Sequence, residues 1–397
     1  MAVNEVRKIL YVSGSRADYG PIRDLLREID SQPNFELSLL VTAMHLKPEH
    51  GMTKTEIERD GFHIAAQVET GVEDGKLVSF STFVGQTMIG IAEVIECQSP
   101  DILLLLGDRA EQLSAAVAGA IQNVTIAHLC GGTNSGSIDG SFRHAISKFA
   151  HYHLPASQPH ADRLIQLGEQ PDTIHVVGLP GGHLGKHVTH TPEDIRNHYG
   201  LPFGKPYLLV LQHPVTHSHQ DAGRQIRETL DAVVEMGLPT LLANPNGDPG
   251  GTKVLEIMTS YASSFDELYL LPPPADRQLF ASVMAHSAVL VGNSSSAVYE
   301  AMSVGLPVVN IGDRQFGREN ESVWVNVGYD RQEIVDGIKA AMFDEEYRSC
   351  LRKYSSALGA YNPEAQVVKI LAELDLSRSS HPKKFFDIAL KQDRSII

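Results

Sequence analysis

Short apolar runs alternate with helical patterns along most of the chain. Nine runs stand between polar or glycine-containing turns: KILYV, LSLLV, ILLLL, TIAHL, YLLVL, TLLA, LYLL, AVLV and PVVNI. Runs of this length are typical of parallel strands that are buried on both faces and joined by helical crossovers. The pattern therefore predicts an α/β fold.

The series of runs pauses once, between Val177 and Lys205, in a stretch rich in Gly, Pro and His. We therefore predict a first Rossmann-like domain over 1–180 and a second over 181–365. Ligands are expected in the cleft between the domains, beyond the carboxyl ends of the strands. The tail, 366–397, is expected either to pack back on the first domain or to stay loose.

Composition narrows the location and the partners of the protein. The formal net charge is −15 and no Lys or Arg cluster occurs, which disfavours a nucleic-acid partner. Cys97, Cys130 and Cys350 are spaced too widely for a disulfide framework or a CxxC metal site, which indicates a reducing cytoplasm. The longest continuous apolar run, 102–106, is far below the roughly 20 residues of a membrane span, so no membrane partner is expected.

The strongest local signal is the segment 292–296, GNSSS, which follows a predicted strand and precedes a predicted helix. Backbone N–H groups and hydroxyls at a helix start form an anion site that suits a diphosphate. Ser294 and Ser295 are equally suited to ordinary helix capping. Glu300, in the same helix, could accept both hydroxyls of a ribose or could be a solvated carboxylate.

Three further turns lie at predicted strand ends. Arg16, in GSRADYGP, is a candidate phosphate or base contact, and the alternative is a local pair with Asp18. Asn246 lies in PNGDPGG, a turn that could admit a sugar or a nucleotide closely. Arg314 and Arg318 lie in a loop after the last predicted strand.

Two carboxylates stand where burial would be costly. Asp108 and Arg109 directly follow the run ILLLL, and a carboxylate there must be paired, functional or a cap of the next helix. Asp139 and Arg143 follow a glycine-rich loop, and their spacing also allows a purely structural (i, i+4) pair.

His213 lies just past a predicted strand and before Pro214. It could protonate or hydrogen-bond an anionic leaving group, although a strand-end His can also be structural. No HExxH, Walker A, CxxC or triad signature is present, so metal hydrolysis, P-loop chemistry and acyl transfer lack support.

Together, the blocks SRADYGP, LGDR, SIDGSFRHAISKFAHYH, LQHPVT, PNGDPGG and GNSSSAVYEAMSVGLPVVNIGDRQFGRE resemble the hydrolysing UDP-N-acetylglucosamine 2-epimerases, especially the branch that starts sialic and legionaminic acid synthesis. They run in family order from about residue 9 to 322. The resemblance implies a glycosyltransferase-B-like fold with the active site between two Rossmann-like domains. It also implies a UDP-amino sugar substrate, elimination of UDP followed by addition of water, no metal or nicotinamide cofactor, and a homo-oligomer, dimer or tetramer.

The resemblance also assigns roles to residues. The candidate UDP contacts are Arg16, Asn246, Ser294, Ser295, Glu300 and Arg314. The candidate catalytic residues are Asp108, Asp139 and His213, with Arg109 or Arg143 in support. Either aspartate could act as base and as acid toward water, and the sequence does not decide between them.

This chain departs from the family pattern in one loop. Family members often read His-Ile-Glu-Gly-Gly-Glu where this chain has Cys130 and Thr133 at the glutamate positions, and Gly140 replaces a frequent acidic residue. Cys130, Thr133 and Arg143 are the candidate substrate-loop residues. Three outcomes stay open: a hydrolysing epimerase on an altered substrate such as a diacetamido-dideoxy sugar, a member that hydrolyses or transfers the sugar without 2-epimerisation, and a non-catalytic UDP-sugar-binding protein.

Overall fold

The computed structural model describes residues 6–71, 77–181, 184–272, 277–296, 300–318, 323–358 and 362–388. Its N-terminal half contains a parallel six-stranded sheet in the order β3-β2-β1-β4-β5-β6. The strands are β1 (Arg7–Ser13), β2 (Phe35–Thr42), β3 (Ile64–Val68), β4 (Ile102–Leu106), β5 (Thr125–Leu129) and β6 (Tyr152–Leu154). The α-helices are α1 (Arg16–Tyr19), α2 (Arg23–Asp30), α3 (Lys54–Arg59), α4 (Leu77–Gln98), α5 (Ala110–Ile121), α6 (Ile138–Phe149) and α7 (Gln158–Gln166).

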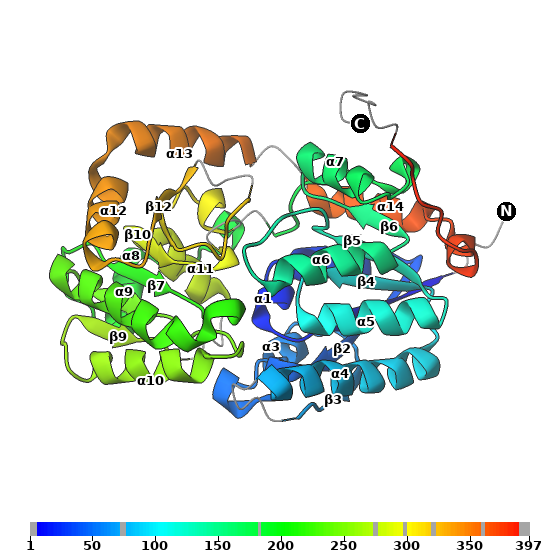
Figure 1. Ribbon diagram of the computed structural model, residues 1–397, viewed down its shortest axis with the longest axis horizontal. Helices are drawn as coiled ribbons and strands as arrows, with labels where there is room; N and C mark the ends of the chain where they lie inside the picture. Colours follow the sequence, from blue (N-terminus) through cyan, green and yellow to red (C-terminus); the bar gives the residue numbers. More distant parts are fainter. Residues whose placement is uncertain are drawn as a thin grey trace, which may run out of the picture.

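The C-terminal half repeats this architecture, with a sheet in the order β12-β11-β10-β7-β8-β9. The strands are β7 (Leu208–Leu211), β8 (Thr240–Leu242), β9 (Leu268–Leu270), β10 (Val289–Gly292), β11 (Val308–Ile311) and β12 (Val325–Val327). The α-helices are α8 (Pro192–Tyr199), α9 (Ala222–Met236), α10 (Gly251–Ala262), α11 (Arg277–His286), α12 (Arg331–Phe343) and α13 (Glu345–Leu358). Both sheets have the doubly wound order 3-2-1-4-5-6, and Figure 1 shows the two halves side by side. The predicted α/β class and the pair of Rossmann-like units are confirmed.

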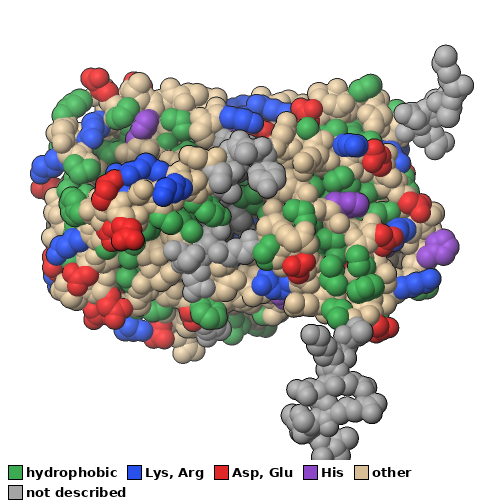
Figure 2. Space-filling view, turned by 90° about the horizontal axis from the view of Figure 1, so that it is seen from above, with side chains coloured by type: hydrophobic (Ala, Val, Ile, Leu, Met, Phe, Trp, Pro, Cys, Tyr) green, Lys and Arg blue, Asp and Glu red, His purple; other side chains and the backbone are tan. Residues whose placement is uncertain are grey.

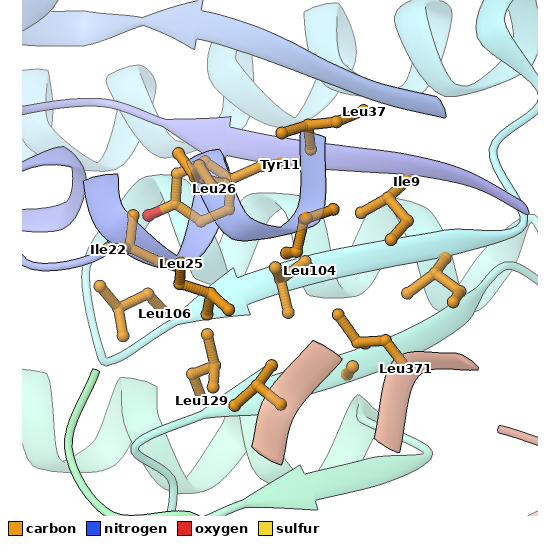
Figure 3. Close-up of a cluster of buried hydrophobic side chains, with 14 of the residues drawn as sticks. Ile9, Tyr11, Ile22, Leu25, Leu26, Leu37, Leu104, Leu106, Leu129 and Leu371 are labelled. Carbon is orange, nitrogen blue, oxygen red and sulfur yellow. The ribbon is translucent and has the colours of Figure 1, made fainter. Parts of the chain in front are cut away.

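All nine predicted runs form strands, and most of their residues are buried. In β4, Leu104 packs into one cluster, while Leu103 and Leu105 pack into the cluster on the opposite face. Figure 3 shows Leu104 among side chains from β1, α2 and the C-terminal helix. The runs did not predict β3, β6 and β12.

The C-terminal segment lies on the first sheet, although it follows the second in sequence. Helix α14 (Pro363–Glu373) packs against α2, and Leu371 joins the core of the first half. Arg7 donates hydrogen bonds of 2.9 Å to the carbonyls of Leu371 and Leu374. Figure 1 shows α14 beside β6 and α7. The domain limits at residues 180 and 365 stay a prediction.

The structure contains one long apolar segment, helix α4. It corrects the expectation, based on continuous apolar runs, that no apolar stretch approaches the length of a membrane span. It has 22 residues and, by length and composition alone, is apolar enough to cross a membrane, because an 18-residue window within it has a mean hydropathy of 1.4. Ser, Thr, Gly and Gln interrupt its apolar residues, which hid it from a search for continuous runs. In the structure α4 is the crossover between β3 and β4 and packs against α5. The cytoplasmic location and the homo-oligomer stay predictions.

Charged side chains are mixed over the face of the molecule that Figure 2 shows. Lys and Arg side chains are interspersed with Asp and Glu over the coloured part of that view, without one continuous basic patch.

Candidate active site

A cavity of about 270 Å³ lies where strand ends and loops of the two halves meet. The carboxyl ends of parallel strands lie at the same edge of each sheet, so loops that are far apart in sequence converge there. Of the predicted site residues, the cavity lining contains Arg16, Asp108, Arg109, Cys130, Asp139, Arg143, His213, Asn246, Ser294, Ser295, Glu300 and Arg314.

Thr133 is the one predicted residue that the structure places outside the cavity. Its side chain is buried, and its hydroxyl lies 3.1 Å from Nε2 of His160 on α7. Gly132, immediately before it, has a left-handed φ of 80° and lies against the carbonyl of His160, where a Cβ would be only 2.2 Å away. The structure thus places Thr133 against α7, outside the residues that line the cavity, and its role in the substrate loop stays a prediction.

Asp108 is held by arginines rather than used as a helix cap. Helix α5 begins after Arg109, which is its N-cap residue and makes no side-chain capping bond, so the capping alternative is wrong. The carboxylate forms an ion pair with Arg143 of α6, and Nη2 of Arg318 lies 3.9 Å from it. Burial raises the pKa of Asp108, but the guanidinium groups of Arg143, Arg318 and Arg314 outweigh it and lower the pKa below its usual value.

The loop that carries Asp108 is fixed by a buried histidine. His128 on β5 is fully buried, and its Nε2 lies 2.8 Å from the carbonyl oxygen of Gly107. Because a carbonyl only accepts, Nε2 carries the proton, and Nδ1 accepts from the hydroxyl of Ser147 at 3.1 Å. Gly107 has a φ of 76°, which lets the chain turn sharply after β4. His128 thus joins the Asp108 loop to α6.

Asp139 lies in the first turn of α6 and has a different environment. Its carboxylate accepts hydrogen bonds from the hydroxyl of Ser137 at 2.8 Å and from Arg314 at 3.3 Å. Burial and the charge of Asp108 raise the pKa of Asp139 to about 6, although Arg314 opposes the shift. The (i, i+4) alternative is wrong, because Asp139 pairs with Arg314 and Arg143 pairs with Asp108.

His213 connects two turns of the second sheet. Its Nδ1 accepts the backbone N–H of Asn246 at 3.1 Å, so in the neutral ring the proton lies on Nε2, 3.2 Å from the hydroxyl of Ser294. Burial, with the charges of Arg314 and Arg109, keeps the pKa of His213 well below its usual value. His213 is therefore a neutral hydrogen-bond donor rather than an acid.

The segment 292–296, which we call the serine loop, caps a helix and also faces the cavity. The hydroxyl of Ser294 accepts the N–H of Ser296 at 3.3 Å, while Ser294 and Ser295 both line the cavity. Gly292, at the end of β10, has a φ of 143° and passes so close to β7 that a Cβ would lie 2.2 Å from the carbonyl oxygen of Leu211. Capping and ligand contact are thus compatible.

The structural alternatives for Glu300 and Arg16 are wrong. Glu300 is buried and pairs with Arg277 of α11 at 3.0 Å, so it is not a solvated carboxylate. Arg16 pairs with Glu56 at 3.1 Å rather than with Asp18. Asp18 instead accepts the backbone N–H groups of residues 14 and 15 at 3.0 and 3.2 Å and thereby shapes the turn that carries Arg16.

Sequence reasoning missed two charged residues of the lining. Arg277 begins a helix and carries no local motif, so only its contact with Glu300 reveals it. Asp248 lies within PNGDPGG and accepts a hydrogen bond from Asn246 at 2.5 Å, so its block could have indicated it. Among the residues that the structure describes, no group of three or more His, Cys, Asp and Glu side chains is placed to hold a metal ion.

Comparisons with known proteins identify the family of the chain. A family model described as UDP-N-acetylglucosamine 2-epimerase matches residues 27–372. The UDP-N,N'-diacetylbacillosamine 2-epimerase (hydrolyzing) of Legionella pneumophila is 34% identical over 94% of this chain and 97% of its own. The UDP-N-acetylglucosamine 2-epimerase of Neisseria meningitidis serogroup B is 30% identical over 85% of this chain and 88% of its own.

A solved structure of a 2-epimerase has the same fold as this chain. The crystal structure of UDP-GlcNAc 2-epimerase from Neisseria meningitidis bound to UDP-GlcNAc superposes with a TM-score of 0.79 over 92% of this chain and 100% of that chain, at 16% identity. The resemblance to the UDP-N-acetylglucosamine 2-epimerase family that was inferred from the sequence is confirmed. The chain belongs to the UDP-N-acetylglucosamine 2-epimerase family and is an enzyme of the UDP-sugar 2-epimerase type.

Proposed function

We propose that the protein is a hydrolysing 2-epimerase of the sialic and legionaminic acid branch, acting on a UDP-linked 2-acetamido sugar, with a diacetamido deoxy sugar favoured. The observation that carries the proposal is a pair of partly buried carboxylates, Asp108 and Asp139, that line one cavity together with a neutral histidine and the serines at 294 and 295. The similarity to the Legionella protein supports the diacetamido sugar.

In this proposal the second half holds UDP. The serine loop and the guanidinium of Arg314 contact the diphosphate, because hydroxyls, N–H groups and a positive charge converge there. Glu300 accepts the ribose hydroxyls while Arg277 keeps it in place. Arg16 and Asn246 complete the UDP contacts from the β1 and β8 turns.

The first half then carries out the chemistry. Asp139 removes the proton at C2 as the bond between C1 and the UDP oxygen breaks, which leaves a C1=C2 double bond and free UDP. Water then adds across this double bond: its proton goes to the face of C2 opposite to Asp139 and its hydroxyl goes to C1, while Asp139 returns the proton it removed to the solvent. Asp139 suits proton transfer because its raised pKa, about 6, lies close to neutral pH. Asp108 stays ionised and holds Arg143 against the site.

The leaving diphosphate needs donors rather than a strong acid. Nε2–H of His213 and the guanidinium of Arg314 lie on the side of the cavity where UDP is proposed to bind. Such preorganised donors stabilise charge that develops on a leaving group. Arg109, which pairs with Glu111 at 3.1 Å, adds positive charge to the lining.

Cys130 does not replace the family glutamate as a base. Its side chain is buried, and burial raises the pKa of its thiol to about 11 despite the positive charges of Arg143 and Arg318. The thiol is therefore neutral at physiological pH. The two aspartates are left as the proposed proton-transfer and electrostatic groups.

The product identifies the reaction. We would incubate the protein with UDP-N,N'-diacetylbacillosamine and, separately, with UDP-GlcNAc, and identify the released sugar by NMR. The proposal predicts free UDP and a free sugar with inverted configuration at C2. A released sugar with retained C2 configuration would instead establish hydrolysis without epimerisation. Binding without release of either sugar would contradict a catalytic role.

A further inference from the structure

One wall of the cavity is apolar, and the proposed reaction does not use it. Met44, Phe80 and Ala110 line the cavity here, and we refer to them as the Phe80 wall. Met44 comes from the 3-10 turn that follows β2, Phe80 from the first turn of α4 and Ala110 from the start of α5.

The Phe80 wall is backed by a small core of its own. Ala43, Phe83 and Ala110 are buried together, with Phe80 and Phe142 packed against them. The rings of Phe80 and Phe83 stack with centroids 5.9 Å apart and an interplanar angle of 19°. Helix α4, which carries both rings, packs along α5. This backing fixes the position of the wall.

The wall adjoins the proposed catalytic residues rather than the nucleotide side. Ala110 directly follows Arg109, whose Nη2 lies 4.0 Å from Sδ of Met44. Phe142, which packs on the same small core, directly precedes Arg143 on α6. Because the proposed UDP contacts lie mainly on the second half, the part of the ligand nearest the wall is the sugar.

Polar side chains next to the wall are already engaged. The hydroxyl of Thr53 lies 2.8 Å from Nδ1 of His45, and His50 has interactions of its own. A sugar hydroxyl placed against the side chains of Met44, Phe80 and Ala110 would lose water without gaining a hydrogen bond from them, whereas a methyl group would gain from the contact.

We propose that the Phe80 wall determines substrate specificity by receiving the methyl at C6 and the methyl end of the acetamido group at C4 of a deoxy amino sugar. The inference rests on the proposed function and names the substrate class that this site prefers. An ordinary hexose would present a hydroxyl at C4 and a hydroxymethyl at C6 to the same apolar surface.

The size of the preference follows from the chemistry of apolar pockets. One methylene more or less in such a pocket changes kcat/KM by roughly 10- to 200-fold. We therefore expect kcat/KM for UDP-N,N'-diacetylbacillosamine to exceed that for UDP-GlcNAc at least about tenfold.

The experiment compares these two donors with variants of the wall. Phe80→Ala removes the ring, and Phe80→Tyr retains the ring and adds a hydroxyl. Phe83→Leu is the matched control, because Phe83 lies on the same helix and is buried behind the wall without lining the cavity. We measure kcat/KM for sugar release with each donor and the Kd of UDP alone.

Both Phe80 variants are expected to lower the ratio of the two kcat/KM values about tenfold or more, while Phe83→Leu retains the wild-type ratio and the Kd of UDP stays within about twofold in all three. A wild-type preference for UDP-GlcNAc, or an unchanged ratio in both Phe80 variants, would overturn the inference. If neither donor is turned over, the proposed function fails, and the ratio of the Kd values for the two sugar nucleotides still tests the wall.

Discussion

Around His213 the second-sheet side of the cavity holds its polar groups through neutral hydrogen bonds, whereas the carboxylates of Asp108 and Asp139 on the first-sheet side are held by ion pairs with arginines. Ser294, His213 and Asn246 are joined by hydroxyl, imidazole and backbone N–H groups. On the other side the carboxylate of Asp108 pairs with Arg143, while that of Asp139 pairs with Arg314, which reaches across from the second half.

This difference in interactions predicts different responses to mutation on the two sides of the cavity. Loss of a neutral hydrogen bond near the surface of a ligand site weakens binding modestly. Loss of one partner of a buried ion pair leaves a desolvated charge and costs far more. Mutations of the serine loop and Glu300 should therefore weaken UDP binding. Mutations of Asp108 and Asp139 should lower the rate of sugar release, and mutation of Asp108 should also lower the free energy of unfolding.

The largest expected effect is on Asp139. We predict that Asp139→Asn lowers kcat for sugar release roughly 10³-fold, because a positioned acid or base contributes about 10²- to 10⁴-fold. The Kd of UDP should stay within a few fold. Asp162→Asn is the control, since Asp162 is exposed and only accepts from Gln158. A variant that retains a tenth of the wild-type rate would remove Asp139 from the proton-transfer role.

Asp108→Asn should affect both rate and stability. We expect kcat to fall about 10²-fold and the free energy of unfolding to fall by about 3 kcal/mol, because the buried guanidinium of Arg143 loses its counter-charge. Denaturant unfolding and steady-state kinetics check the two effects. The control, Asp172→Asn, breaks an exposed pair with Arg378 and should cost less than about 1 kcal/mol. Equal stability losses in the two variants would contradict the contrast between buried and exposed pairs.

A smaller effect is expected on the UDP side. Ser295→Ala combined with Glu300→Gln should raise the Kd of UDP about tenfold, measured by calorimetry, since each lost ligand contact costs roughly 1 kcal/mol. Loss of the buried pair between Glu300 and Arg277 should also lower the free energy of unfolding. At saturating substrate, kcat should change less than about threefold. Exposed Glu193→Gln serves as the control. Unchanged affinity would reduce the serine loop to a helix cap.

The smallest expected effect concerns pH. Because the pKa of Asp139 is raised to about 6, kcat/KM should fall as the pH drops through about 6 and the base becomes protonated. Burial keeps His213 neutral, so His213→Gln should lower the rate only modestly and retain the same acid limb. Disappearance of that limb in His213→Gln would show that the histidine titrates there.

The sequence predicted the parts of the fold that depend on local burial. Continuous apolar runs indicated the central strands, but β12 and most of β3 are partly exposed. Strand β6 has only three residues, and its buried His153 pairs with Glu169 at 2.9 Å. Such segments do not form apolar runs, so pattern alone could not identify them.

The same dependence on local pattern explains which features of the site could be predicted from the sequence. Strand-end residues could be predicted because parallel strands bring their carboxyl ends together, and all of them except Thr133 reach the cavity. The ion-pair partners of these residues could not be predicted, because the pairs join segments that are far apart in the sequence. These pairs are Asp108 with Arg143 and Asp139 with Arg314. Local spacing instead suggested false pairs between Arg16 and Asp18 and between Asp139 and Arg143.

Hydrogen exchange at C2 tests the division of the site into a UDP half and a proton-transfer half most directly. The reaction is run in D2O with UDP-N,N'-diacetylbacillosamine, and deuterium at C2 of the released sugar is measured by NMR. We predict one deuterium at C2 with the wild-type enzyme and with the Ser295→Ala, Glu300→Gln variant at saturating substrate, and almost no deuterated product in the same time with Asp139→Asn. Release of a sugar that retains its original proton at C2 would contradict the account.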